Sequence, residues 1–302
     1  MAEPAMTDDR CLPILAVQAT APPAGEDPLP RFAADLRARV ALFPESRLVL
    51  YPELHLTPPG GEGQMRRLAE RVPGPRTEAL CDLAAELGIW LVPGSMYERG
   101  EGERIHNTTI AISPDGEIVA RYRKCFPWRP WEETDPGDEF VVFDIPDVGR
   151  LGLSICYDTW FPEVARHLSW MGAEVILSPT LTTTADREQE LVLARAAAIA
   201  NQVFVVNLNA ASPSGTGASL IADPEGHVLM QAGEGPVPLT QVLDLGAVAR
   251  VRRHGSSGLN RLWSQMRVGD PVLPLPLYDG ALDPRRLIEG GWARRAEGSV
   301  PD

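Results

Sequence analysis

Short apolar runs rich in Val, Ile and Leu alternate along the chain with longer stretches of helical periodicity. Short apolar runs bounded by turn residues are typical of buried strands. They predict strands at 13–18, 47–53, 89–95, 107–113, 150–156, 174–179 and 203–209. The longer stretches between them predict helices at about 29–42, 75–87, 161–171 and 186–201. This alternation indicates an α/β protein whose helices cover β-sheets.

Turn residues and the absence of a linker-like stretch predict where the domain begins and ends. Segments 113–119 and 222–228 contain Asp-Gly and Glu-Gly, which supply the positive φ that tight hairpins need. No stretch before about residue 270 has the composition of a linker, and no repeat of solenoid period occurs. We therefore expect a single domain over 11–270, followed by a Pro- and Gly-rich tail over 271–302 that lies on the surface or against a partner.

Composition narrows the classes of function. A chain of 302 residues, 44% of them hydrophobic, can bury a large core. The net charge of −13 repels phosphate backbones, so nucleic acid is not expected as a partner. No apolar run has membrane-spanning length, and the acidic start lacks the layout of an export signal. Four scattered cysteines fit reduced thiols in a cytoplasmic protein better than a disulfide framework: Cys11, Cys81, Cys125 and Cys156.

Cys156 lies where the apolar run 150–156 stops and a helical pattern begins. Most free cysteines are buried and inert, and position alone favours that interpretation. A thiol on a strand-to-helix turn is nevertheless exposed at a sheet edge, and the amides that follow it can bind developing negative charge. Cys156 is therefore a candidate nucleophile that needs an activating base.

Three charged residues are candidates for the remaining chemistry. Glu53 ends a predicted strand, where α/β folds place functional side chains, and Lys124 follows another apparent strand. Glu132 lies in "PWRPWEE" (127–133), and its aromatic and proline neighbours predict a partly dry environment that raises its pKa. Taken singly, each could be an ordinary exposed side chain. Together they supply a base for a thiol, a cation for an oxyanion and a second carboxylate to hold that cation.

Ordered motifs add a resemblance to a known family. "YPEL" (51–54), "YRKCFPWRPWE" (122–132) and "CYDTWFPEVAR" (156–166) resemble the glutamate, lysine and cysteine segments of the nitrilase superfamily of carbon–nitrogen hydrolases. "ARAAAIANQVFVVNLN" (194–209) and "GTGASLIADPEGHVL" (215–229) resemble its later core segments. The lysine segment is most similar to the aliphatic-amidase branch. Where many members have a second arginine and a glutamate, this chain has Ala197 and Ala200.

The resemblance implies a role for each residue. Cys156 would be the nucleophile, Glu53 the base and Glu132 the fourth catalytic residue. Lys124 would stabilise the oxyanion together with the backbone N–H of Tyr157. It also implies an αββα sandwich over 11–270, usually assembled into dimers or larger homo-oligomers, and no cofactor.

Other candidate chemistry is weak. The five histidines have no metal-ligand spacing, so no metal site is expected. "SGTGAS" (214–219) lacks the Lys-Ser/Thr of a phosphate loop, and no Gly-x-Ser-x-Gly elbow occurs. Asp158 and Glu163 fit best as polar residues that open the helix after Cys156.

We hypothesise a cofactor-free cytoplasmic enzyme that hydrolyses the C–N bond of a small amide and releases ammonia through a thioester. The Tyr-Asp that follows Cys156 favours the amidase branch, because nitrilases of the superfamily more often carry Trp-Glu there. Trp128, Trp131 and Trp160, with Tyr157, could wall a pocket for an apolar or flat substrate, or could be core. The alternatives are a nitrilase, an N-carbamoyl amidohydrolase, an ammonia-supplying glutaminase subunit and a catalytically idle binding protein.

Overall fold

The computed structural model describes residues 10–22, 27–59, 62–265, 267 and 269–271. The chain divides into two compact units, 1–262 and 263–302, with the short 3-10 turn η3 (Leu262–Ser264) at the division. Of the predicted tail over 271–302, all but residue 271 lies outside the described residues. The architecture that follows is that of the first unit.

One β-sheet is built around β1, β2 and β3, which run parallel, while its other strands pair antiparallel. β6 (Ile118–Arg123) pairs with β5 beside the main strand order. That order is β13 (Val237–Asp244), β1 (Cys11–Gln18), β2 (Leu48–Leu50), β3 (Trp90–Val92), β5 (Ile105–Ile112) and β4 (Ser95–Arg99).

The second sheet repeats this plan, with β8, β9 and β10 parallel and antiparallel strands on either side. Its order is β12 (Val228–Gln231), β11 (Leu220–Ala222), β10 (Phe204–Asn209), β9 (Val175–Thr180), β8 (Gly149–Leu153) and β7 (Val141–Ile145).

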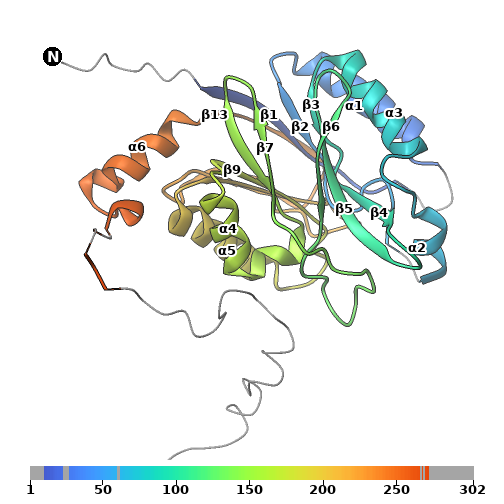
Figure 1. Cartoon of the computed structure of the whole chain (residues 1–302). Helices are drawn as coiled ribbons and strands as arrows, with labels where there is room; N and C mark the ends of the chain where they lie inside the picture. The colour runs from blue at the N-terminus through green and yellow to red at the C-terminus, as the bar shows by residue number, and fades with distance from the viewer. Residues whose placement is uncertain (1–9, 23–26, 60–61, 266, 268, 272–302) are drawn as a thin grey trace, which may run out of the picture. The chain divides into compact units, whose positions relative to one another are not determined.

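Helices cover the outer face of each sheet (Figure 1). α1 (Leu29–Leu42) and α3 (Pro75–Leu87) pack on the first sheet, and α4 (Pro162–Trp170) and α5 (Arg187–Asn201) pack on the second. The remaining helical elements are α2 (Glu62–Leu68), η1 (Cys156–Trp160), α6 (Gly246–His254) and η2 (Ser256–Gly258). The predicted αββα sandwich is confirmed.

Alternation along β1 shows how the sequence specifies these layers. Leu12, Ile14 and Ala16 point into the core between the two sheets, whereas Leu15 and Val17 point into the core under α1 and α3. Successive side chains of a strand face opposite sides, so a strand buried on both faces reads as a continuous apolar run. The predicted run at 13–18 was recognisable for that reason.

Most predicted elements are present, and most differences lie at strand ends and sheet edges. The predicted strand 89–95 was wrong as a single strand, because the chain forms two strands there, β3 and β4, with β5 between them in the sheet. Helices 29–42 and 75–87 have the predicted bounds. β2 ends at Leu50 and β8 at Leu153, so the predicted strands extend too far, and Glu53 and Cys156 follow the strands rather than end them. The sequence patterns missed several elements, among them β12 and β13, which lie at the sheet edges and have mixed exposure.

Gly94 fixes the segment that carries Glu53. Its φ is +85°, in a region that L side chains rarely adopt, and a Cβ atom there would lie 1.9 Å from the carbonyl oxygen of Pro52. Only glycine allows the backbone after β3 to approach the residue before Glu53 this closely.

We expect Gly94→Ala to destabilise the protein more than Gly88→Ala, measured by urea unfolding. Gly88 also has a positive φ, +64°, but its added Cβ would meet nothing within 4 Å. Gly88→Ala should therefore cost only the left-handed penalty of roughly 1–2 kcal/mol. Equal losses of stability would contradict the close approach at Pro52.

Candidate active site

The structure brings together the four side chains that the sequence selected: Glu53, Lys124, Glu132 and Cys156. Glu53 and Cys156 follow the carboxyl ends of parallel strands in different sheets, and Lys124 follows β6 directly. The Lys124 Nζ atom lies 3.0 Å from Glu53 Oε1 and 2.6 Å from Glu132 Oε2. Cys156 completes the group, because its thiol interacts electrostatically with both Glu53 and Lys124.

Lys124 is a charged group inside the protein, with only 2% of its side chain exposed. Burial by itself lowers a lysine pKa, because it penalises the ammonium form. Here the negative charge of Glu53, then that of Cys156 when it is ionised and that of Glu132, outweigh burial and raise the pKa of Lys124 well above its ordinary value. The site therefore contains a permanent cation beside the sulfur.

The two carboxylates flanking Lys124 have opposite shifts. Burial raises the pKa of Glu53, and the nearby Glu132 charge adds to this against the attraction of Lys124. At Glu132 burial also favours the neutral acid, but Lys124 and hydrogen bonds from Asn107 and the Trp128 amide outweigh it, so the pKa is lowered. The raised pKa expected for Glu132 from its neighbours in sequence was wrong. Glu53 is thus the carboxylate better suited to accept a proton, and Glu132 stays ionised.

Asn107, in β5, is a site residue that the sequence analysis missed. Its buried Nδ2 donates to Glu53 Oε1 at 2.8 Å and to Glu132 Oε1 at 3.0 Å. One amide thereby joins two carboxylates that would otherwise repel each other. The sequence predicted only that Asn107 belongs to a strand, "NTTIAIS" (107–113). Its role depends on contacts with Glu53 and Glu132, which lie far from it along the chain.

Cys156 begins η1 with an unusual backbone conformation. Its φ is +46°, which costs a non-glycine residue of the order of 1–3 kcal/mol. Amides in the first turn of a helix have no intrahelical acceptor, so the Tyr157 N–H is available to an oxyanion next to the sulfur. Cys156 thus lies at the turn from β8 into η1, here called the elbow.

Burial raises the pKa of the Cys156 thiol well above its ordinary value of 9.0. The Glu53 and Glu190 charges raise it further, while Lys124 and a hydrogen bond from the Leu181 amide lower it. The raised pKa favours a thiol that keeps its proton at rest. The arrangement can pass that proton to Glu53 as sulfur bonds to carbon.

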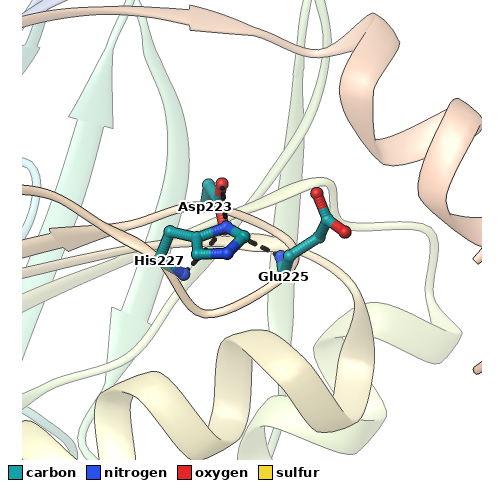
Figure 2. Close-up of side chains that lie close together, drawn as sticks. All are labelled: Asp223, Glu225 and His227. Atoms are coloured by element: carbon teal, nitrogen blue, oxygen red, sulfur yellow. Dashed lines mark hydrogen bonds and ion pairs between the residues drawn. The ribbon is translucent and has the colours of Figure 1, made fainter. Parts of the chain in front are cut away.

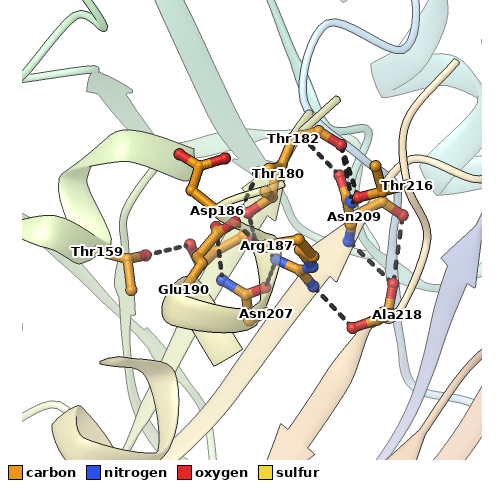
Figure 3. Close-up of polar contacts among 12 residues, drawn as sticks. Thr159, Thr180, Thr182, Asp186, Arg187, Glu190, Asn207, Asn209, Thr216 and Ala218 are labelled. Atoms are coloured by element: carbon orange, nitrogen blue, oxygen red, sulfur yellow. Dashed lines mark hydrogen bonds and ion pairs between the residues drawn. The ribbon is translucent and has the colours of Figure 1, made fainter. Parts of the chain in front are cut away.

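A buried polar cluster surrounds Thr182, the residue that follows Leu181 (Figure 3). Thr182 donates its hydroxyl to Glu190 at 2.6 Å, and its amide donates to Asn209 at 2.8 Å. Glu190 in turn pairs with Arg187 at 2.8 Å, and Arg187 donates to Asn207 at 2.6 Å. The backbone amide beside the sulfur is thereby held from the ends of β9 and β10.

The predicted pocket aromatics form two groups. The ring centroids of Trp128 and Trp131 are 6.1 Å apart, and those of Tyr157 and Trp160 are 5.9 Å apart. Trp131 is 73% exposed, whereas the other three are half-buried. Their contact with a substrate stays a prediction.

One histidine joins a small acidic cluster, Asp223, Glu225 and His227, in the turn between β11 and β12 (Figure 2). Asp223 accepts hydrogen bonds from the amides of Glu225 and His227 at 2.9 Å each, and from the His227 ring at 3.0 Å. These bonds account for the cluster as part of the hairpin turn that "ADPEGHV" predicted.

A family model described as carbon–nitrogen hydrolase matches residues 15–253. The chain therefore belongs to the carbon–nitrogen hydrolase family, in the nitrilase superfamily, as its motifs indicated. In the part of the chain that the structure describes, none of the helices has the length and apolar character needed to cross a membrane.

Relatives and solved structures agree with this assignment. Human omega-amidase NIT2 is 32% identical, over 71% of this chain and 83% of that protein. Nit3 of Saccharomyces cerevisiae, a member of branch 10 of the nitrilase superfamily, matches with a TM-score of 0.74 at 28% identity, covering 81% of this chain and 94% of that one. A mutant of the amidase from Nesterenkonia sp. AN1 in complex with butyramide matches with a TM-score of 0.67 at 25% identity, covering 80% and 94%.

The charges around the sulfur predict how its reactivity changes with pH. In Glu53→Gln the loss of a negative charge should lower the pKa of the Cys156 thiol, and in Lys124→Gln the loss of a cation should raise it. The pH profile of iodoacetamide alkylation, followed on the Cys156 peptide by mass spectrometry, should therefore move in opposite directions in the two variants.

Cys125 provides an internal control in the same digest. Burial raises its pKa to about 11, and neither Glu53 nor Lys124 is among the groups that shift it. Its profile should stay in place in both variants. Movement of the Cys156 profile in the same direction in both would contradict the described geometry.

Proposed function

We propose that this protein is a cysteine-dependent amidase that hydrolyses the C–N bond of a small linear amide to a carboxylic acid and ammonia. The observation that carries the proposal is the buried cluster in which Lys124 hydrogen-bonds to Glu53 and Glu132 beside the Cys156 thiol at the strand ends. A thiol, a base and a fixed cation are the groups that acyl transfer requires.

The first half of the reaction forms a thioester. Cys156 sulfur bonds to the carbonyl carbon while its proton passes to Glu53, and the carbonyl oxygen gains the negative charge. That oxygen faces the Lys124 ammonium and the Tyr157 N–H. Glu53 then gives its proton to the nitrogen, the C–N bond breaks and ammonia leaves.

The second half consumes water. Glu53 removes a proton from water while the water oxygen bonds to the thioester carbon. The new oxyanion again faces Lys124 and the Tyr157 N–H. The C–S bond breaks, the acid is released and the proton returns to sulfur. These steps balance with protein groups and water alone, so the proposal includes no cofactor.

Glu132 acts on this sequence through Lys124. Its Oε2 binds Nζ at 2.6 Å, and its Oε1 is held by Asn107 and by Thr134 at 2.9 Å. Because these partners keep Glu132 ionised, they fix the ammonium beside the sulfur during turnover.

An amide is favoured over the alternatives for the substrate class. The relatives include proteins named as amidases, and one of them is bound to butyramide, a short aliphatic amide. Half-buried Trp128, Tyr157 and Trp160 favour a substrate with an apolar or flat portion. The complete Glu-Lys-Glu-Cys set argues against an idle binding protein, while a nitrilase and an N-carbamoyl amidohydrolase remain the rival activities.

We also propose a cytoplasmic location and a homo-oligomer. All four cysteines are free, which fits a reducing compartment. Large apolar side chains of α4 and α5 are exposed, including Trp170 at 74%, Val192 at 66% and Ile199 at 50%. Self-association through such residues would bury them.

For a matched pair of substrates with one carbon skeleton, we expect a higher kcat/KM for the amide than for the nitrile. An amide reaches the tetrahedral species directly, whereas a nitrile must first form a thioimidate and gain protons on nitrogen. Ammonia release measures both reactions. A higher value for the nitrile, or amide accumulating as its end product, would favour the nitrilase alternative.

Substitutions of Cys156 and Lys124 test the assigned roles, with Cys125→Ser as the control. Cys156→Ala should abolish turnover, while Cys125→Ser should keep substantial activity. Lys124→Ala should lower kcat and kcat/KM together by about 10²–10³, the usual cost of losing one oxyanion donor. If Lys124→Ala raises only KM, the lysine binds substrate rather than the transition state.

A further inference from the structure

Asp158 is completely buried two residues after Cys156, and its carboxylate contacts two separate segments of the chain. The sequence suggested only that it opens the following helix. Its contacts extend much further, from the elbow of the second sheet to β6 of the first.

One carboxylate oxygen holds the elbow. Asp158 Oδ2 accepts a hydrogen bond from the Ile155 amide at 2.8 Å, directly before Cys156. The Asp158 amide donates back to the Ile155 carbonyl at 3.0 Å. This closed loop encloses Cys156, whose positive φ needs support from its surroundings.

The same carboxylate also holds the segment that carries Lys124. Asp158 Oδ1 accepts from the Phe126 amide at 3.0 Å, and Oδ2 accepts from the Tyr122 hydroxyl at 2.7 Å. The Tyr122 oxygen in turn accepts a weak bond from the Cys125 amide at 3.4 Å. Tyr122 and Phe126, on either side of Lys124, therefore bind Asp158 directly, and Cys125 is linked to it through Tyr122.

We propose that Asp158 is a positioning residue that sets the placement of the Lys124 ammonium relative to the Cys156 sulfur. It acts through the backbone on either side of both residues, and it joins the two sheets at the point where the site is assembled. This inference rests on the catalytic roles proposed above for Lys124 and Cys156. A misplacement of about 1 Å at a reacting centre can cost about 10²-fold in rate.

Asp158→Asn tests the proposal with little change of shape. One oxygen becomes an NH2 group, which cannot accept, so either the Phe126 amide or the Ile155 amide loses its acceptor. Burial raises the pKa of Asp158 to about 7, so kinetics are compared at pH 8, where wild-type Asp158 is ionised. We expect kcat to fall by about 10²-fold with KM little changed.

Tyr122→Phe is the matched milder variant. It removes one of the three donors to Asp158 and leaves both amide bonds in place. We expect a smaller fall in kcat than in Asp158→Asn. If Asp158→Asn does not fold, as judged by circular dichroism and thermal unfolding, Tyr122→Phe replaces it in every comparison below.

A double-mutant cycle separates positioning from general loss of structure. If Asp158 acts by placing Lys124, Asp158→Asn should reduce kcat far less in a Lys124→Ala background than in the wild type. An equal fold-loss in both backgrounds, or a change in KM alone, would overturn the proposal.

A second readout needs no substrate, so it separates failure of this inference from failure of the proposed function. Lys124→Gln should shift the alkylation profile of Cys156 in the wild-type background, and the shift should shrink in the Asp158→Asn background. A shift of unchanged size would overturn the positioning role even if the substrate class were wrong. If the shift does shrink but the wild-type protein hydrolyses no amide, only the proposed function is overturned.

Discussion

The site depends on one ion, the Lys124 ammonium, held inside the protein between two carboxylates. A lone buried cation would lose its proton or leave the interior, because its desolvation is not compensated. Glu53 and Glu132 supply the compensation, and Asn107 joins the two carboxylates so that they can share one cation. Removing Lys124 or one of the two carboxylates would leave a buried charge less well compensated, so each such substitution also costs stability. Burial of apolar side chains in the surrounding core offsets the free energy that this buried charge costs.

This arrangement shifts the pKa values of the two carboxylates in opposite directions. Both Glu53 and Glu132 bind the same ammonium, yet Glu132 receives additional donors from the Trp128 amide and Thr134. Glu53 faces the thiol instead and is more deeply buried. Chemical identity therefore does not decide which acid moves protons, and the surrounding donors do.

The sequence predicted what depends on local pattern. Helices 29–42 and 75–87 could be bounded because apolar periodicity is framed by Pro near the start, and the second ends before Gly88 in a left-handed conformation. Edge strands such as β13 were missed because half-exposed residues blur the apolar pattern. Motifs identified the candidate residues but not their pKa shifts. The neighbours of Glu132 in sequence predicted a raised pKa, whereas Lys124, which contacts it in the fold, lowers that pKa. Asn107 and the long reach of Asp158 depend on contacts between strands that no local pattern contains.

Glu53 and Lys124 follow strands of one sheet, and Cys156 follows a strand of the other. The apolar layer between the sheets is therefore a spacer whose thickness sets the reach from sulfur to base. Substitutions of Leu151, Leu153 or Val175 in that layer therefore change the distance between the sheets as well as the stability of the fold. A slightly thinner or thicker spacer would leave a folded protein whose two halves of the site no longer meet.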